Sequence, residues 1–450
     1  MHLASLVLSA IVLCAAATTA AFGEESSGKD VPKPKNEAPQ PQHLLGDWGG
    51  FRSGLHDDGI DLSAAYTGQG AYNVSGGMDT GAAYAQQLQL GVDIDWKKLA
   101  GLNGFSTHAV FINRAGNNVS TDYVGDNLIQ AQSIYGGAGD VLVHLVDVYG
   151  DLKLAKGRID IAAGRLPVGE DYATSPLYCQ FLNTAVCGYP NAIAAKAGFS
   201  TFPNSTWGAR VRVATAKHLY VQAGAYEVRP RAGGRSGFDW GWSGTTGTYY
   251  PVEVGYEPVF GPNMLEGHYK AGFAHDTSDY PDLYRDQNGD PFAATGLPQL
   301  QHGGRDSTYV LADQMIVRNA AGPERGLIVT GGYVWSDKAT SQLSRFFFLG
   351  LTDKGFLASR PDDVLGIVFA KESISGSVTA TQQIQATMNQ PLLMDAPGVQ
   401  SEETVIEAHY DWAAHPGLTL TPDIQYIMHP GGAETYPDAV VIGAQLAADF

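Results

Sequence analysis

Glu407, His409 and Asp411 alternate along one short stretch, and residues of these types can bind a metal ion. Alternate residues of a β-strand share one face, so the same pattern is also typical of polar residues that line a water-filled space. We favour that lining and predict neither a metal nor a cofactor. HExxH, GxSxG, CxxC and Walker-type motifs are absent from the sequence, which argues against an enzyme.

Cys179 and Cys187 are eight residues apart and are flanked by residues typical of loops. In an oxidising compartment this spacing favours a disulfide over a redox or metal-binding pair. Cys14 lies in an apolar N-terminal run and is not expected to persist in the mature chain.

Arginine side chains follow the same alternation rule. In residues 206–214 the apolar parity includes Trp207 and Val211, so Arg210 and Arg212 should face the opposite, wet side. Arg165 shares the parity of apolar residues in its own strand, so it must lie beyond the strand end or after a bulge.

Period-two alternation recurs along the chain and is clearest in residues 84–96, where Leu88, Leu90 and Val92 alternate with polar or small residues. The last twelve residues, 439–450, alternate in the same way, and we expect the chain to end within its last strand. The sequence therefore predicts an all-β fold of about sixteen antiparallel strands closed into a transmembrane barrel. The expected strands are 60–72, 84–96, 104–113, 142–154, 158–166, 206–214, 218–228, 251–260, 265–275, 307–318, 327–336, 343–351, 364–371, 404–412, 418–428 and 439–450. A half-buried strand of a soluble sandwich would alternate similarly, so composition must help to decide.

The composition favours the barrel. Only 16% of the 450 residues are charged, compared with roughly 25% in soluble domains, and the chain holds 55 Gly and 22 Tyr. A net charge of −18 disfavours nucleic acid as a partner. No segment has the roughly 20 apolar residues that a spanning helix needs.

The N-terminal region is expected to precede the barrel. Residues 1–21 read as a secretory signal peptide, and residues 22–43 as a disordered leader rich in Pro, Glu and Lys. A single barrel domain is predicted over residues 44–450. Trp48, Phe51 and Leu55 have helical spacing and Gly59 would end the turn, which indicates a short helix at the periplasmic mouth.

Connection lengths also alternate, as expected for short periplasmic turns and long outer loops. Short connections at 155–157, 215–217 and 261–263 alternate with long ones at 113–141, 167–205, 229–250 and 277–306. The rule fails once, because the connection after Ser336 is short and that at 352–363 is long.

Three motifs resemble the carbohydrate-selective porin (OprB) family over residues 44–450. They are DWGGFRSGLHDDGI, GRLPVGEDYATSPLYCQFLNTAVCGYP and PDIQYIMHPGG. The resemblance implies a sixteen-stranded barrel in the outer membrane of a Gram-negative bacterium, in contact with its lipid, through which monosaccharides and similar small solutes diffuse passively. It leaves a monomer and a trimer both open. It also implies that residues 167–205 fold into the lumen, stapled by Cys179 and Cys187, and that Arg165 belongs to the narrowest part of the pore.

A neutral sugar needs hydrogen-bond donors, acceptors and aromatic faces along its path, each binding weakly enough for release. We therefore expect Arg165, Arg210 and Arg212 as donors, Glu170 and Asp171 as acceptors, and Tyr172 or Tyr178 as aromatic neighbours. The alternatives are a loop that only shields the barrel mouth, a non-transporting barrel such as an adhesin or structural protein, and, less favoured, an outer-membrane enzyme.

Overall fold

The computed structural model describes residues 43–125, 128–135, 139–193, 198–230, 236–319 and 325–450. The chain divides into two units, Met1–Gln42 and His43–Phe450, and the second contains all the described residues. The predicted signal peptide and, except for His43, the predicted leader lie outside the described residues.

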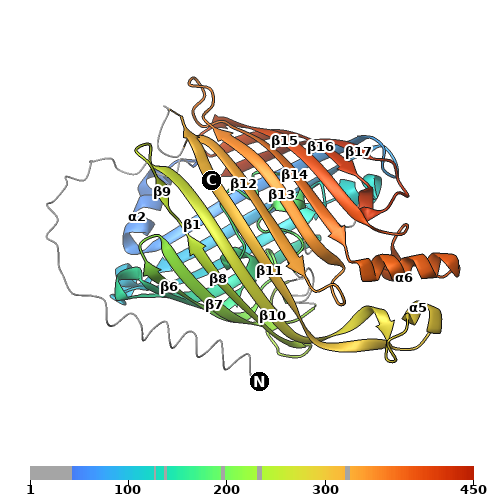
Figure 1. Ribbon diagram of the computed structural model, residues 1–450. Coiled ribbons are helices and arrows are strands. Elements are labelled where there is room, and N and C mark those ends of the chain that lie inside the picture. The colour runs from blue at the N-terminus through green and yellow to red at the C-terminus, as the bar shows by residue number, and fades with distance from the viewer. Residues whose placement is uncertain (1–42, 126–127, 136–138, 194–197, 231–235, 320–324) are drawn as a thin grey trace. The chain divides into compact units, whose positions relative to one another are not determined.

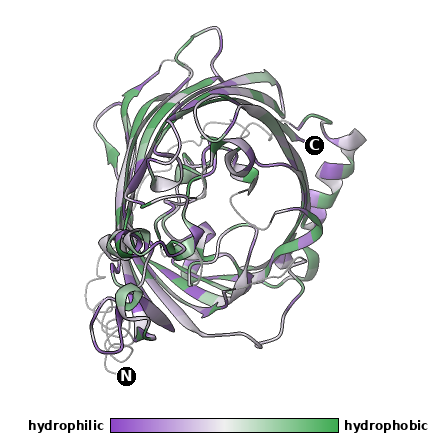
Figure 2. Ribbon diagram, turned by 90° about the vertical axis from the view of Figure 1, so that its right-hand side faces the viewer, coloured by the Kyte–Doolittle hydropathy of each residue, from purple (hydrophilic) through white to green (hydrophobic). Residues whose placement is uncertain are grey.

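One antiparallel sheet forms the wall, and it closes because β1 pairs with both β2 and β17. Sixteen long strands make the barrel and a two-residue strand, β9, adds to the edge of β10, so the predicted number is confirmed. Figure 1 shows the tilted strands and Figure 2 the ring that they form. The strands are β1 (Ile60–Ser75), β2 (Gly81–Asp95), β3 (Phe105–Gly116), β4 (Val141–Leu154), β5 (Ile159–Leu166), β6 (Thr206–Ala216), β7 (Leu219–Val228), β8 (Gly247–Tyr256), β9 (Val259–Phe260), β10 (Leu265–Asp286), β11 (Gln299–Arg318), β12 (Gly326–Ser336), β13 (Leu343–Lys354), β14 (Val364–Ile374), β15 (Glu402–His415), β16 (Leu418–Met428) and β17 (Ala439–Asp449).

Helices are short and lie outside the wall strands. They are α2 (Phe51–Asp58), α3 (Trp96–Ala100), α4 (Val168–Asp171), α5 (Phe292–Thr295) and α6 (Gly376–Thr387). Among the described residues, none of these helices combines the length and the apolar character needed to cross a bilayer. Helix α2 matches the predicted N-terminal helix and ends at Gly59, whose φ of 91° is the left-handed conformation that glycine adopts without strain.

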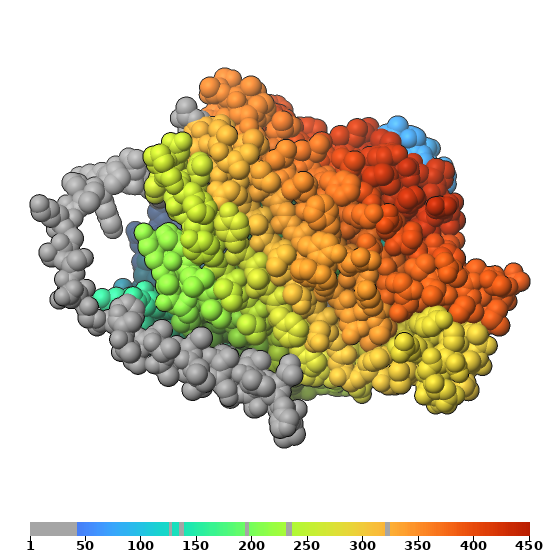
Figure 3. Space-filling model, in the orientation of Figure 1, coloured from blue at the N-terminus to red at the C-terminus, as the bar shows by residue number. Residues whose placement is uncertain are grey.

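Side chains alternate between the two faces of the wall, as the period-two pattern predicts. In β14, Leu365 and Ile367 are exposed while Val364, Gly366 and Val368 are buried. The exposed face is the apolar one because it meets lipid rather than water. Figure 3 shows the side chains of β10 to β14, in yellow to orange, packed together over one face of this wall.

The predicted outer loop at 277–306 is wrong over most of its length. Strands β10 and β11 continue through it as a hairpin that projects beyond the other strands and carries α5 next to α6 (Figure 1). The Asp286 carboxylate closes the tip by accepting hydrogen bonds from the backbone N–H groups of Asn288 and Asp290 and from the Thr295 hydroxyl. Apolar alternation is weak here because the hairpin extends past the lipid-facing wall.

The predicted exception to the connection-length rule is real, and a second one occurs at the start of the barrel, where the β1–β2 connection (76–80) is shorter than the β2–β3 connection (96–104). The β12–β13 connection spans only residues 337–342, whereas the β13–β14 turn spans residues 355–363. Asp363 stabilises that longer turn, since its carboxylate accepts hydrogen bonds from Arg360 and from the backbone of Ala413.

An arginine introduced on the outer face of β2 should destabilise the barrel more than one introduced on its inner face. Leu90 is 48% exposed on the outer face, and its neighbour Gln89 lines the interior. We expect Leu90→Arg to destabilise the barrel by about 2–4 kcal/mol if the site lies near the bilayer centre, and less toward an interface. Gln89→Arg should cost much less. Equilibrium folding into phospholipid bilayers measures both, and equal losses for the two variants would contradict the assigned faces.

Candidate functional site

Two loops enter the barrel and narrow it, as the view in Figure 2 shows. The long inner loop, residues 167–205, connects β5 to β6 and carries α4 and a short 3-10 turn, η6 (Thr184–Val186). The short inner loop, residues 117–140, connects β3 to β4 and carries the turns η3 (Ser120–Val124) and η4 (Ser133–Tyr135). The entry of the long inner loop agrees with what the family resemblance implied.

Carboxylates on three separate parts of the wall hold the long inner loop. Glu407 of β15 accepts hydrogen bonds from the backbone N–H groups of Leu182 and Asn183, at 2.6 and 3.1 Å. Glu253 of β8 accepts one from Ala173 at 3.0 Å, and Asp313 of β11 accepts one from the Ser175 hydroxyl at 3.0 Å. Because these bonds come from strands far apart in the sheet, the loop must cross the interior.

Glu407 and His409 point inward as predicted, but they are buried under the long inner loop and do not line water. His409 packs edge-on against Phe181, with ring centroids 4.8 Å apart, and its Nδ1 lies 3.1 Å from Asp411. The prediction of a solvated wall at these two residues is therefore wrong, because the sequence pattern gave the face but not the loop that covers it. Within the described ranges, no group of His, Cys, Asp and Glu side chains is arranged to hold a metal ion.

The short inner loop is bonded to the long one. The Thr184 N–H donates to the Gln130 carbonyl at 2.8 Å, and the Thr184 hydroxyl accepts from the Gln130 N–H at 2.6 Å. Wall amides complete the support, since Gln425 donates to the Ala131 carbonyl and Gln69 donates to the Ser133 hydroxyl. The sequence does not reveal this contribution, because residues 113–141 indicate only that the connection is long.

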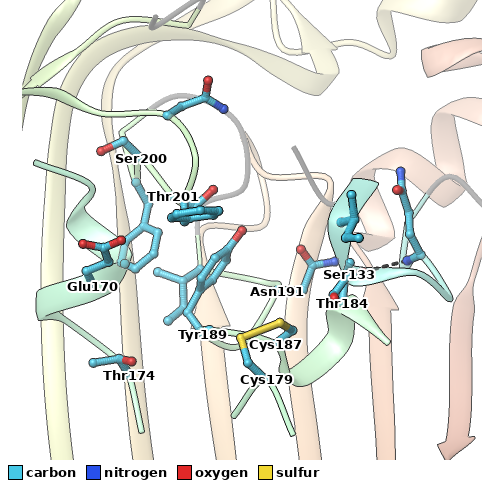
Figure 4. Close-up of a pocket in the computed structure, with 18 of the residues that line it drawn as sticks. Ser133, Glu170, Thr174, Cys179, Thr184, Cys187, Tyr189, Asn191, Ser200 and Thr201 are labelled. Carbon is cyan, nitrogen blue, oxygen red and sulfur yellow. Dashed lines mark hydrogen bonds between the residues drawn. A yellow bond between two sulfur atoms is a disulfide. The ribbon is translucent and has the colours of Figure 1, made fainter. Parts of the chain in front are cut away.

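Between the two loops and the wall lies a cavity of about 1010 Å³. Figure 4 shows Glu170 on one side of it and Ser133 and Thr184 on the other, with Tyr189 and the disulfide between them. Its lining mixes charged, amide, hydroxyl and aromatic side chains, including Gln87, Gln89, Arg114, Gln130, Ser133, Glu170, Thr184, Tyr189, Asn191, Phe199, Phe202, Asn204, Arg229 and Arg305. Cys179 and Cys187 form a disulfide that borders the same space.

Arg114 of β3 is a lining residue that sequence reasoning did not single out. Its Nε donates to the Gln87 side chain at 2.7 Å, and its guanidinium lies 5.4 Å from the centre of the Phe202 ring. Inward parity was the available signal, since Ile112, two positions earlier, is buried on the interior side. The register of β3, however, could not reveal which inward residue meets the loops.

Glu170 and Asp171, both in α4, have different surroundings. Glu170 faces the cavity, yet the enclosing wall displaces bulk water, so burial raises its pKa and the nearby Asp147 and Asp171 carboxylates add to that shift. Burial also raises the pKa of Asp171, while the bonded guanidinium of Arg210 opposes the shift. Arg210 contacts both Asp171 and Asp160 at 2.6 Å, so it ties the loop to the wall.

The predicted aromatic residues support the loop instead of lining the cavity. Tyr172 is buried edge-on against Tyr226, and Tyr178 is buried edge-on against Phe348. Burial raises the pKa of both tyrosines. Arg212 stacks over the Tyr220 ring at 3.9 Å, beside the same part of the wall.

Arg165 lies away from the cavity. It is 1% exposed and donates to the carbonyls of Ser205 and Asp239, at 2.5 and 3.1 Å. Its guanidinium is 5.9 Å from the ring of Trp207, a residue of the lipid-facing parity. The structure thus brings Glu170, Asp171 and Arg210 together and leaves Arg165 apart from them.

Removing the wall carboxylate at Glu407 should loosen the long inner loop. Glu407→Ala leaves two buried N–H groups without their acceptor, at a cost of about 1–3 kcal/mol each. We expect larger open-channel noise in planar bilayers and faster proteolytic cleavage within residues 172–193. Glu402→Ala is the control, because Glu402 lies on the same strand and pairs with Lys371 at a partly exposed site. Equal noise and cleavage in two fully folded variants would contradict the role of Glu407.

Comparison with known proteins gives a consistent result. The family described as carbohydrate-selective porin, OprB family, matches residues 79–450. Porin B of Pseudomonas aeruginosa is 31% identical over 424 residues, which cover 92% of this chain and 92% of that protein. The putative porin QuiX of Acinetobacter baylyi is 27% identical over 91% of this chain and 93% of that protein. The high-pH structure of Pseudomonas putida OprB aligns with a TM-score of 0.85 at 30% identity, covering 91% of this chain and 99% of that one. The chain therefore belongs to the OprB family of carbohydrate-selective porins and is a sugar-preferring channel of the Gram-negative outer membrane.

Proposed function

We propose that monosaccharides cross the barrel through the cavity between the two inner loops and leave it chemically unaltered. The observation that carries this proposal is the mixed lining of the cavity, in which donors and acceptors stand beside aromatic faces. Sugar hydroxyls both donate and accept hydrogen bonds. Arg114 and the lining amides offer donors to the sugar oxygens, and Glu170 offers an acceptor to the sugar O–H groups. Phe202 and Tyr189 present rings to the apolar C–H face of a pyranose.

The size of the cavity and the spread of its polar groups favour passage of a solute over tight binding. The volume lies near the upper end of the roughly 300–1,000 Å³ that small-molecule sites occupy. The polar groups come from several strands and both loops, so no single cluster surrounds a solute with strong bonds. Successive weak contacts allow a solute to enter and leave, which a diffusion channel requires.

Of the residues predicted from sequence, we propose two roles. Glu170 contacts the solute directly, and Asp171 with Arg210 positions α4 so that Glu170 faces the cavity. Tyr172, Tyr178 and Arg212 stabilise the loop and wall around it, and the Cys179–Cys187 disulfide keeps this part of the loop compact. We also propose that residues 1–21 are removed as a signal peptide, that residues 22–43 form a leader, and that the barrel domain over residues 44–450 contacts outer-membrane lipid.

Arg114 should set the preference for polyhydroxylated solutes. Because a hydrogen bond contributes about 1 kcal/mol, we expect Arg114→Ala to lower the ratio of glucose flux to triethylene glycol flux by about fivefold. The two solutes are of similar size but differ in their hydroxyl number, so a purely steric change affects both. Swelling of reconstituted liposomes measures the ratio.

Arg285→Ala is the matched control, since Arg285 is exposed on the projecting hairpin and does not line the cavity. An unchanged glucose ratio in Arg114→Ala, with normal folding, would refute the assigned path. A parallel rise of both fluxes would show that Arg114 only restricts the width.

A further inference from the structure

The wall has a notch where the long inner loop leaves it. Strand β4 spans Val141–Leu154, but β5 pairs with it only between Val148 and Leu154. Strand β5 ends at Leu166, where the polypeptide turns inward. The part of β4 that lies N-terminal to Val148, residues 141–147, therefore has no β5 partner. An open strand edge is costly at membrane depth because lipid offers no hydrogen bonds.

A segment of the β7–β8 connection covers this notch from the outside. We call residues 236–243 the latch. The Ser236 carbonyl accepts a hydrogen bond from the Leu145 N–H at 2.9 Å, so the latch takes a place that β5 leaves empty. At Gly237, φ is +71° and an added Cβ would lie 2.0 Å from the Leu145 carbonyl oxygen, so only glycine permits this approach.

Two buried arginines fix the latch to the barrel. Arg165 and Arg229 both donate to the Asp239 carbonyl, at 3.1 and 3.2 Å. Arg229 also donates to the Gly241 carbonyl at 2.7 Å and forms an ion pair with the Asp239 carboxylate. The polar backbone of the latch is therefore bonded toward the protein.

The outer side of the latch is aromatic and exposed. Phe238, Trp240 and Trp242 are 51%, 44% and 65% exposed. Trp207 on β6 contacts both tryptophans of the latch, and its indole N–H donates to the Trp240 carbonyl. The Trp240 indole N–H in turn donates to the Gly237 carbonyl, so two of the indoles have satisfied N–H groups.

We propose that the latch is a membrane contact whose aromatic side inserts at the boundary between the headgroups and the acyl chains of the outer leaflet and seals the notch. Three features favour lipid over a second copy of this chain. The aromatic side continues the lipid-facing surface, because Trp207 shares the parity of Val211, which is 40% exposed. The Leu145 N–H is already bonded within the chain, so it offers nothing to a partner strand. Indole rings also favour the membrane interface, where the long outer loops of a porin meet the leaflet.

Fluorescence of Trp242 tests the proposal in the full-length porin. Subtracting the emission of Trp242→Phe from that of the unsubstituted protein isolates this residue among the seven tryptophans of the chain. In vesicles of phosphatidylcholine brominated near the start of its acyl chains we expect the difference signal to fall about twofold relative to unbrominated vesicles, as for an indole at the membrane interface. Quenching by aqueous acrylamide with no effect of bromine would overturn the proposal. Protection from both quenchers, together with cross-linking of two chains through position 242, would assign the surface to a second copy instead.

Gly237→Val provides a second readout, because it should detach the latch without changing an aromatic residue. We expect bromine quenching of Trp242 to decrease and the folded band on unheated gels to be lost at a lower temperature. Gly241→Ala is the control, since an added Cβ there makes only ordinary van der Waals contacts, 3.8 Å from Asp239 Oδ1, and the residue has no left-handed φ. Unchanged quenching and heat resistance in Gly237→Val would contradict the proposal that the latch seals the notch beside Leu145.

Discussion

Buried carboxylates on the inner wall are the constraint on which the pore depends. A loop that crosses a wide barrel has backbone N–H groups that are not paired within a helix or a sheet. When these groups are buried, they need hydrogen-bond acceptors from elsewhere in the protein. Glu253 and Glu407, from strands on different parts of the wall, accept those donors and fix the loop at several points. The fixed position of the long inner loop determines which side chains face the cavity.

The same loop leaves a gap in the strand pairing of the barrel wall. By turning inward after Leu166 it leaves part of β4 without a neighbour, and the latch fills that place. Ser205 lies at the junction of the two arrangements, since it ends the long inner loop and accepts a hydrogen bond from Arg165, which also holds the latch. The narrow part of the pore and the outer wall are therefore parts of one bonded structure.

The barrel was predictable because alternation is local and repeats on every strand. Leu90 beside Gln89 already indicates two faces, and sixteen such segments imply closure. The position of the loops was not predictable in this way, because it depends on pairs such as Asn183 and Gln425, which are 242 residues apart. For that reason Arg114 was overlooked, and Arg165, which lies beside a conspicuous motif, was expected in the pore although it belongs to the outer wall. Glu170 lines the cavity and could be singled out from the sequence because it lies within the loop itself, while its contact with a solute stays a prediction.

The pairing of β1 with β17 has a consequence for assembly. The ring is complete only when this seam forms. Its acceptors Glu407 and Gln425 lie on β15 and β16, which a ribosome makes late. The long inner loop can therefore form all its contacts with the wall only after nearly the whole chain has been made, so the anchoring of the loop and the closure of the ring both depend on the last strands.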